Sequence, residues 1–192
     1  MKYKSIRAIM VTLFLVTTIM FMGNCGSGNG PDPDPDPCVK EYGKWWWTQP
    51  IAEDVIFGVG TAKKQSPQLE RDMSYQRAAA EVGKQVEIQI QALISDFMQE
   101  SGIGDAAQAL EFTEVVSTGT VNRSLAGCKV ICRNPMDDGL YSLVSLPIDQ
   151  IRTDALNEAK NAASRDEALY NEFKAKQGFE KLENKLDNMN GN

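Results

Sequence analysis

Side chains that could do chemistry are few along this chain, and histidine is absent altogether. Without imidazole the chain lacks the commonest general base, the commonest zinc ligand and any Ser-His or Cys-His nucleophile pair. Adjacent carboxylates occur at Glu53-Asp54 and at Asp137-Asp138. A carboxylate hydrolase needs its two acids several ångströms apart across a cleft, a geometry that neighbours in a turn seldom reach. We therefore expect no enzymatic activity, no cofactor and no metal site.

Cysteine is the other reactive residue type, with four in the sequence. Cys128 and Cys132 lie in an expected strand, where four residues separate Cα atoms by about 13 Å. A disulfide needs them within about 7 Å, so this pair cannot close. Cys38 could pair with either Cys128 or Cys132 and would then staple the start of the domain to the sheet. The alternative, which the sequence favours, is that all three remain unpaired and buried.

The first 24 residues have the pattern of an export signal. Three basic residues precede an unbroken run of apolar residues and threonines, residues 8–22, which is 15 residues long. That is shorter than the roughly 20 residues that span a bilayer as a helix. Met22-Gly23-Asn24-Cys25 resembles the lipobox of bacterial lipoproteins, which implies cleavage before Cys25 and attachment of acyl chains such as palmitate to that cysteine. An uncleaved anchor and a plain secretory signal are the alternatives.

Residues 25–37 predict a lipidated cysteine followed by a spacer. Gly, Ser and Asn residues follow Cys25, and residues 31–37 alternate strictly between Pro and Asp. Neither stretch can bury apolar surface, so neither folds alone. Alternating proline favours extended polyproline II, in which seven residues reach roughly 20 Å. We expect this spacer to hold the following domain clear of a membrane. The residue after the cysteine is Gly26 rather than aspartate, which resembles the pattern of lipoproteins that are delivered to the outer membrane.

Charge argues against nucleic-acid partners. Removing residues 1–24 takes away three basic residues and no acidic ones, which leaves 17 of the 20 Lys and Arg against 26 Asp and Glu. A mature chain with a net charge of about −9 is repelled by phosphate backbones and by anionic headgroups.

Aromatic residues gather at Trp45-Trp46-Trp47. Neighbours on an extended chain alternate sides, so the three cannot all face one core. We expect one or two to pack as a lid on the sheet and at least one to be exposed or to contact a partner. A platform for sugars or peptides is the alternative. These three tryptophans are the candidate contact residues.

The elements that would position these residues follow from sequence patterns. Residues 55–62 predict a buried strand whose Gly58 and Gly60 allow close packing of a helix rather than nucleotide binding. Ser66 and Pro67 start a helix that extends to Glu100, and residues 105–125 predict a second, less regular helix. Two strands, 128–133 and 140–146, follow, joined by a turn at residues 134–139. The core stripe of the long helix comprises Ala79, Val82, Val86, Ile90, Leu93 and Phe97.

Alternation along the two later strands predicts their faces. Cys128, Val130 and Cys132 form one apolar face, while the second strand contributes Leu140, Val144 and Leu146. The residues between them, Ile131, Tyr141 and Leu143, point the other way, which favours a second covered face.

Residues 149–192 predict a C-terminal helical tail. Phe179, Leu182, Leu186 and Met189 follow the 3-4-3 spacing of a coiled-coil seam. The stripe either docks on the domain or associates with a second copy or a partner protein.

Residues 47–62, the alanine-rich helix around residues 77–82 and the Leu125-Ala126-Gly127-Cys128 segment resemble the LPP20 lipoprotein family over roughly residues 45–148. The resemblance implies a β-α-β-β module on an outer-membrane lipoprotein, related to the N-terminal domain of a flagellar assembly protein and without catalytic residues. We thus expect an α+β domain at residues 38–148, a three-stranded antiparallel sheet on a long helix, followed by the tail.

The leading hypothesis is a non-catalytic envelope lipoprotein that binds another envelope component through the tryptophans or the C-terminal helix. A module with a small-ligand pocket between helix and sheet, floored by Gly58 and Gly60, is the alternative.

Overall fold

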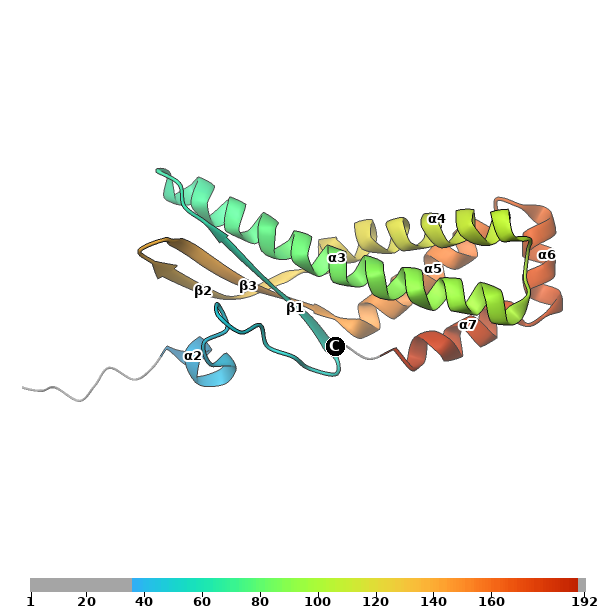
Figure 1. The fold of residues 1–192 in the computed structure, drawn as a ribbon, viewed down its shortest axis with the longest axis horizontal. Coiled ribbons are helices and arrows are strands. Elements are labelled where there is room, and N and C mark those ends of the chain that lie inside the picture. The colour runs from blue at the N-terminus through green and yellow to red at the C-terminus, as the bar shows by residue number, and fades with distance from the viewer. Residues whose placement is uncertain (1–35, 190–192) are drawn as a thin grey trace, which may run out of the picture. The chain divides into compact units, whose positions relative to one another are not determined.

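A computed structural model of the chain describes residues 36–189 (Figure 1). The expected signal peptide, the lipidated Cys25 and nearly all of the spacer lie outside these residues. The described chain is an α+β fold with one three-stranded sheet. Its elements in order are α2 (Pro37–Tyr42), β1 (Val55–Ala62), α3 (Pro67–Ser101), α4 (Ala106–Ser124), η1 (Leu125–Gly127), β2 (Lys129–Met136), β3 (Gly139–Pro147), α5 (Ile148–Ala163), α6 (Glu167–Ala175) and α7 (Gly178–Asp187).

The sheet has the order β1-β3-β2, and both pairings are antiparallel, as predicted. The register of β1 on β3 runs from Val55 opposite Pro147 to Ala62 opposite Leu140. The expected six-residue turn at 134–139 is wrong, because β2 continues to Met136 and only two residues connect it to β3. Pro135 is tolerated in β2 because an edge strand does not need a ladder hydrogen bond on both sides.

Helix α3 confirms the predicted long helix and crosses the sheet before continuing beside α4 (Figure 1). Ser66 occupies its N-cap position, but the hydroxyl makes no capping hydrogen bond, and Pro67 is the first helical residue. Gly102 ends the helix in the left-handed region at φ 60°. That conformation costs glycine little, which is why the helix stops there.

Two glycines of β1 let α3 approach the sheet, as the sequence predicts. A Cβ placed on Gly58 would collide with the carbonyl oxygen of Ala78, and one on Gly60 with the amide nitrogen of Ala78 and the carbonyl oxygen of Ser74. The helix backbone therefore lies directly on the strand, where no side chain fits between them.

One hydrophobic core joins the helices to the inner face of the sheet. On α3 the stripe is shifted slightly from the prediction: Ala78 and Ile94 are fully buried, whereas Ala79 and Leu93 are only half-buried. The same core contains Met189, just after α7, and residues of all three C-terminal helices: Ile151, Ala155, Leu169, Phe173, Leu182 and Leu186. Of the two possibilities for residues 149–192, the structure has the stripe docked on the domain. Helices α5 to α7 are part of the domain, and the predicted 3-4-3 stripe is buried within the chain.

A β-bulge changes the faces of β2. Val130 pairs with Val144 and Cys132 with Leu143, so the register shifts by one residue between them. The extra residue, Ile131, moves every later side chain of the strand to the opposite face. The prediction that Cys128, Val130 and Cys132 share one face is therefore wrong for Cys132, which lies on the outer face of the sheet.

The free edge of β1 is occupied by side chains. The carbonyl oxygen of Phe57 accepts hydrogen bonds from Gln49 Nε2 at 2.7 Å and from Gln85 Nε2 at 2.9 Å. Further along the same strand, the carbonyl oxygen of Thr61 accepts a hydrogen bond from Arg77 Nη1 at 2.5 Å. The other edge strand, β2, carries a bulge and a proline. Both edges are thereby protected against pairing with a strand of another chain.

Candidate functional site

The outer face of the sheet is covered by residues 36–54, which we call the N-terminal clasp. Figure 1 shows this segment with α2 on the side of the sheet away from α3. A second hydrophobic cluster forms beneath it, in which Trp45 is packed among Phe57 of β1, Cys132 of β2 and Leu143 of β3. The expectation of a covered second face is met by this segment.

Local interactions shape the start of the clasp. The Asp36 carboxylate caps α2 by accepting a hydrogen bond from the backbone N–H of Cys38 at 2.9 Å. Gly43 ends the helix at φ 62°, a backbone conformation that favours glycine. The chain then turns so that Trp45, two residues on, enters the cluster on the sheet.

A disulfide fixes the clasp to β2. Cys38 and Cys132 are bonded across 94 residues of sequence, with their Cα atoms 5.9 Å apart. The sequence left open whether Cys38 pairs with Cys128, pairs with Cys132 or stays unpaired. The structure has the Cys38–Cys132 pair, so the favoured expectation of three unpaired cysteines is wrong. Cys128 keeps its thiol, because it packs against the core on the inner face, whereas the bulge carries Cys132 to the outer face.

Two hydrogen bonds and one aromatic contact complete the attachment. Gln49 Nε2 donates to the carbonyl oxygen of Phe57, and the N–H of Ile148 donates to the carbonyl oxygen of Asp54 at 2.9 Å. The Tyr42 ring meets Phe57 edge-on, with ring centroids 5.8 Å apart. These contacts hold the middle of the clasp against β1 and its last residue against the start of α5.

The three tryptophans take three different environments, as the sequence predicts. Trp45 is 1% exposed and forms the lid on the sheet, and Trp46 is half-buried against it with ring centroids 5.6 Å apart. Trp47 is 87% exposed, and nearby Ile51 is 79% exposed. Ile51 was not among the sequence candidates. The signal that could have found it is a lone large apolar residue within a Pro-, Glu- and Asp-containing loop.

The buried Trp45 has one unfavourable feature. Its indole N–H is buried without a hydrogen-bond acceptor among the described residues. Burying a tryptophan removes about 200 Å² from water, which is worth about 5 kcal/mol. An unpaired buried donor costs about 1–3 kcal/mol. The free energy gained by burying the Trp45 ring therefore exceeds the cost of its unpaired N–H, and the ring stays buried with a smaller net stabilisation.

The acidic pairs considered from sequence lie in exposed loops. Glu53 and Asp54 are both exposed in the loop before β1. Asp137 and Asp138 form the β2–β3 turn, where the Asp138 carboxylate accepts a hydrogen bond from the Tyr141 hydroxyl at 2.8 Å. That hydrogen bond is the main cause of a pKa of Tyr141 above its usual value. No cluster of three potential metal ligands occurs among residues 36–189.

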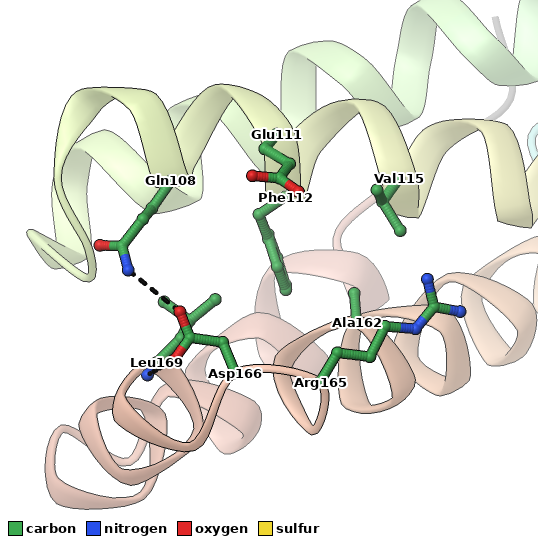
Figure 2. A pocket seen from close by; sticks show the side chains of 8 residues that line it. All are labelled: Gln108, Glu111, Phe112, Val115, Ala162, Arg165, Asp166 and Leu169. Carbon is green, nitrogen blue, oxygen red and sulfur yellow. Dashed lines mark hydrogen bonds between the residues drawn. The ribbon is translucent and has the colours of Figure 1, made fainter.

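The space proposed for a ligand between helix and sheet is filled. Gly58 and Gly60 face the backbone of α3 at contact distance, so neither floors a pocket. Elsewhere, a cavity of about 180 Å³ lies between α4 and the α5–α6 turn (Figure 2). It is lined by Gln108, Glu111, Phe112, Val115, Ala162, Arg165, Asp166 and Leu169. Ligand pockets usually enclose about 300–1,000 Å³, so this one is small for a metabolite.

Polar contacts beside that cavity are structural. Asp166 caps α6 through the N–H groups of Ala168 and Leu169, and Gln108 Nε2 donates to its other carboxylate oxygen at 3.1 Å. Figure 2 shows this hydrogen bond between the two side chains, which both line the cavity. Gln108 also closes the capping box of α4 with Asp105. One glutamine thus joins the N-termini of two helices.

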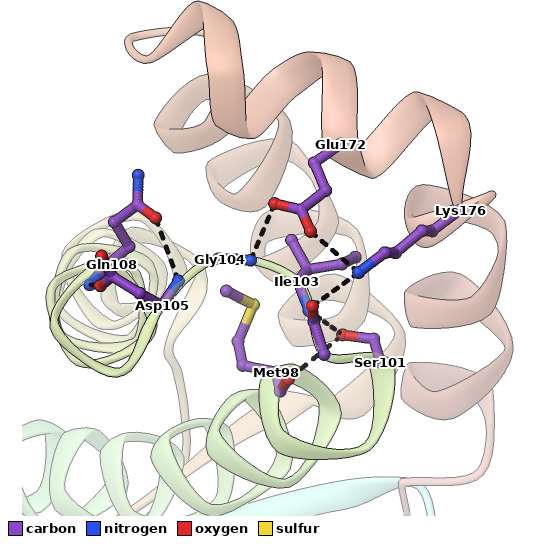
Figure 3. A network of polar contacts seen from close by, with 9 residues as sticks. Met98, Ser101, Ile103, Gly104, Asp105, Gln108, Glu172 and Lys176 are labelled. Atoms are coloured by element: carbon purple, nitrogen blue, oxygen red, sulfur yellow. Dashed lines mark hydrogen bonds and ion pairs between the residues drawn. The ribbon is translucent and has the colours of Figure 1, made fainter.

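A second network fixes the α3–α4 turn to α6 (Figure 3). The Glu172 carboxylate accepts hydrogen bonds from the N–H of Gly104 at 3.0 Å and from Lys176 Nζ at 2.8 Å. Lys176 Nζ also donates to the carbonyl oxygen of Gly102 at 2.6 Å. Lys176 and the Gly104 N–H stabilise the carboxylate and hold the pKa of Glu172 below its usual value.

Burial raises the pKa of the Cys128 thiol to about 11. The thiolate is the nucleophilic form, so this cysteine is poorly suited to catalysis at neutral pH. It is a structural residue of the inner face.

No helix among residues 36–189 combines the length and the apolar character needed to cross a bilayer. No family model matches the chain, and comparisons with curated proteins and with solved structures find no significant match. The resemblance to the LPP20 family therefore stays a prediction. The N-terminal clasp, with Trp46, Trp47 and Ile51 at its surface, is the candidate site that the geometry offers.

Proposed function

We propose that this chain is a non-catalytic lipoprotein of the bacterial envelope, anchored through acyl chains on Cys25 and delivered to the outer membrane. The folded domain contacts another envelope protein through the N-terminal clasp. The proposal assigns the anchor to the lipobox-like sequence and the contact to the exposed side of the tryptophan segment.

The observation that carries the contact surface is the exposure of Trp47 and Ile51. Aromatic residues anchor protein interfaces when they become buried by a partner, because they combine large area with few rotatable bonds. Trp47 and Ile51 leave most of their side chains in water although they lie on a segment held by a disulfide and by a buried neighbour. An ordered backbone lowers the entropy lost on binding, so this surface is prepared for a partner.

The clasp takes this role in place of the C-terminal helix. Leu182 and Leu186 are at most 1% exposed, and Met189 is 8% exposed, so the stripe that suggested self-association is occupied within the chain. Association through it would require α7 to leave the core.

Co-purification from cross-linked envelopes tests the contact. We expect a Trp47→Ala, Ile51→Ala double variant to lose proteins that the unaltered chain captures. Ile88→Ala on α3 is the matched control, since Ile88 is also a well-exposed apolar residue, at 68%, but lies outside the clasp. The control should capture the same proteins as the unaltered chain. An identical capture pattern for the double variant would remove the clasp from the proposal.

A further inference from the structure

The clasp has few non-covalent attachments for a segment of 19 residues. Helix α2 has no buried residue. Trp45 is the fully buried large side chain of the segment, and its indole N–H has no acceptor among the described residues. The remaining polar contacts are the hydrogen bonds at Gln49 and Asp54, both in the second half of the clasp.

The disulfide lies at the opposite end of the clasp from those hydrogen bonds. Cys38 is the third residue of the clasp, and its bond to Cys132 is the covalent link of α2 to the sheet. Without it, the first half of the clasp would be held by the partly buried rings of Tyr42 and Trp46 and by Trp45. Segments with few buried contacts open at low free energy, so the first half of the clasp depends on the bond more than the helical core does.

We propose that the Cys38–Cys132 disulfide is a redox-controlled closure: reduction by a dithiol releases residues 36–54 from the outer face of the sheet while the helical core stays folded. The core does not depend on the bond, because the inner-face cluster around α3, α4, α5 and α7 contains neither bonded cysteine.

The exchange reaction is balanced. One thiolate of the dithiol attacks Sγ of Cys38, which is half-buried, whereas Cys132 is 3% exposed. The Cys38–Cys132 bond breaks, and the Cys132 sulfur leaves as a thiolate and takes up a proton. The second thiol of the reagent then displaces Cys38 and closes the reagent's own disulfide. Two electrons and two protons pass to the chain, and the dithiol is oxidised.

No other cysteine of the described chain competes in this exchange. Cys128 packs on the inner face of the sheet and is separated from the bond by the sheet itself. Its thiol is also poorly ionised, since burial raises its pKa to about 11. In the reduced state, Cys38 is therefore free to leave with the clasp. A new disulfide between Cys128 and Cys132 does not form in its place.

Release changes two surfaces at once. Trp46, Trp47 and Ile51 lose their fixed relative positions, and Phe57 and Leu143 lose the cover that Trp45 provides. The presentation of the contact surface is thus limited to the oxidised protein. This consequence rests on the proposed function, whereas the release of the clasp does not.

Release can be measured on the full chain with trypsin and tryptophan fluorescence, before and after treatment with dithiothreitol. Lys40 and Lys44 are exposed within the clasp, and all three tryptophans of the sequence lie in it. On reduction we expect cleavage after Lys44 to accelerate roughly tenfold or more, because cleavage requires local opening. The tryptophan emission should shift to the red as Trp45 becomes hydrated, while far-UV circular dichroism stays unchanged.

Two variants separate the bond from general effects of reduction. Cys38→Ser should be cleaved rapidly with or without dithiothreitol, and Cys128→Ser should respond as the unaltered chain does. If Cys38→Ser does not fold, reduced protein capped with N-ethylmaleimide replaces it. Unchanged cleavage and emission after verified reduction would overturn the proposal. Loss of helical signal on reduction would overturn it as well, since the bond would then hold the whole domain.

A separate readout keeps this proposal apart from the contact role. The cross-linking experiment is repeated on reduced and capped protein. If the clasp is released but captured proteins stay the same, the closure stands and the contact surface is rejected. If the clasp is not released, the closure is rejected whatever the captured proteins are.

Discussion

The hydroxyl oxygens of Ser74 on α3 and Ser142 on β3 lie 2.8 Å apart, and both residues are fully buried. Ser74 Oγ also donates to the carbonyl oxygen of Arg71 at 3.0 Å. Because a hydroxyl has one hydrogen, Ser142 is the donor in the pair and Ser74 the acceptor. This contact spans the helix–sheet interface next to the strand on which α3 packs through bare glycines.

The two serines should respond unequally to removal. Ser74→Ala leaves the buried Ser142 hydroxyl without its hydrogen-bond acceptor and should lower the free energy of unfolding by about 1–3 kcal/mol. Ser142→Ala leaves the Ser74 hydrogen on Arg71 and should cost only about 0.5–1.5 kcal/mol. The double variant should cost less than the sum of the two. Urea unfolding measures all three, and equal single costs that add would contradict the assignment of donor and acceptor.

Glycine-to-alanine substitutions should change the free energy of unfolding in opposite directions at Gly60 of β1, which faces the α3 backbone, and at Gly83 of α3, which faces side chains of α4 and η1. Gly60→Ala puts a methyl into the backbone of α3 and should destabilise the domain by about 1–3 kcal/mol or more. Gly83→Ala on α3 meets only side chains, at 3.5 Å, and should stabilise it by up to about 1 kcal/mol through helix propensity.

Thermal or urea unfolding of both glycine variants is the measurement. A neutral Gly60→Ala would mean that α3 does not lie on β1 as closely as described.

The main helix–sheet architecture could be predicted because its signals are local. Pro67 and Gly102 mark the two ends of α3, and the spacing of Val82, Val86 and Ile90 identifies its buried face. Gly58 and Gly60 indicated the close approach, since glycine in a strand leaves room for another backbone. None of these inferences needed information from a distant part of the chain.

The tryptophans of the site and the covered second face could be predicted, but the attachment of the clasp could not, because it depends on long-range relationships. A bulge at Ile131 reverses the later part of β2, and no residue type in that stretch announces it. The partner of Cys38 follows from that reversal. The sequence also could not show whether the stripe of Leu182 and Leu186 is buried against this chain or against another chain. An apolar stripe indicates that a helix face is buried but does not identify what buries it.

Acid should weaken the network that fixes the α3–α4 turn. The folded-state pKa of Glu172 is lowered by Lys176 and by the Gly104 N–H from an ordinary value of 4.5. Its stabilising contribution is therefore fully present above about pH 4.5 and is lost as the pH falls through the lower folded-state pKa. Because the side chain is 36% exposed, solvent screens the effect and keeps it modest.

The measurement is the pH dependence of stability for Glu172→Gln. The variant should be less stable than the unaltered chain at pH 7, and the difference should shrink below pH 4.5. Glu180→Gln on α7 is the control, since Glu180 is exposed and forms no ion pair among the described residues. A constant difference between pH 3 and pH 7 would contradict the ionic role.

Cys128 should react slowly in the folded protein. Raising the thiol pKa from 9.0 to about 11 lowers the thiolate fraction at pH 8 about a hundredfold, and burial slows access further. Iodoacetamide labelling followed by peptide mass spectrometry should find Cys128 unmodified before denaturation and fully modified after it. Rapid labelling in the native state would show that this thiol is on the surface of the molecule.

Anchoring is the premise that places the clasp near other envelope components, and it concerns a cysteine outside the described residues. Intact-mass spectrometry of the protein extracted from bacterial membranes tests it most directly. We predict a chain that begins at Cys25 and carries the added mass of diacylglycerol, and a Cys25→Ala variant without that mass. A soluble, unmodified polypeptide that retains Cys25 would contradict the account.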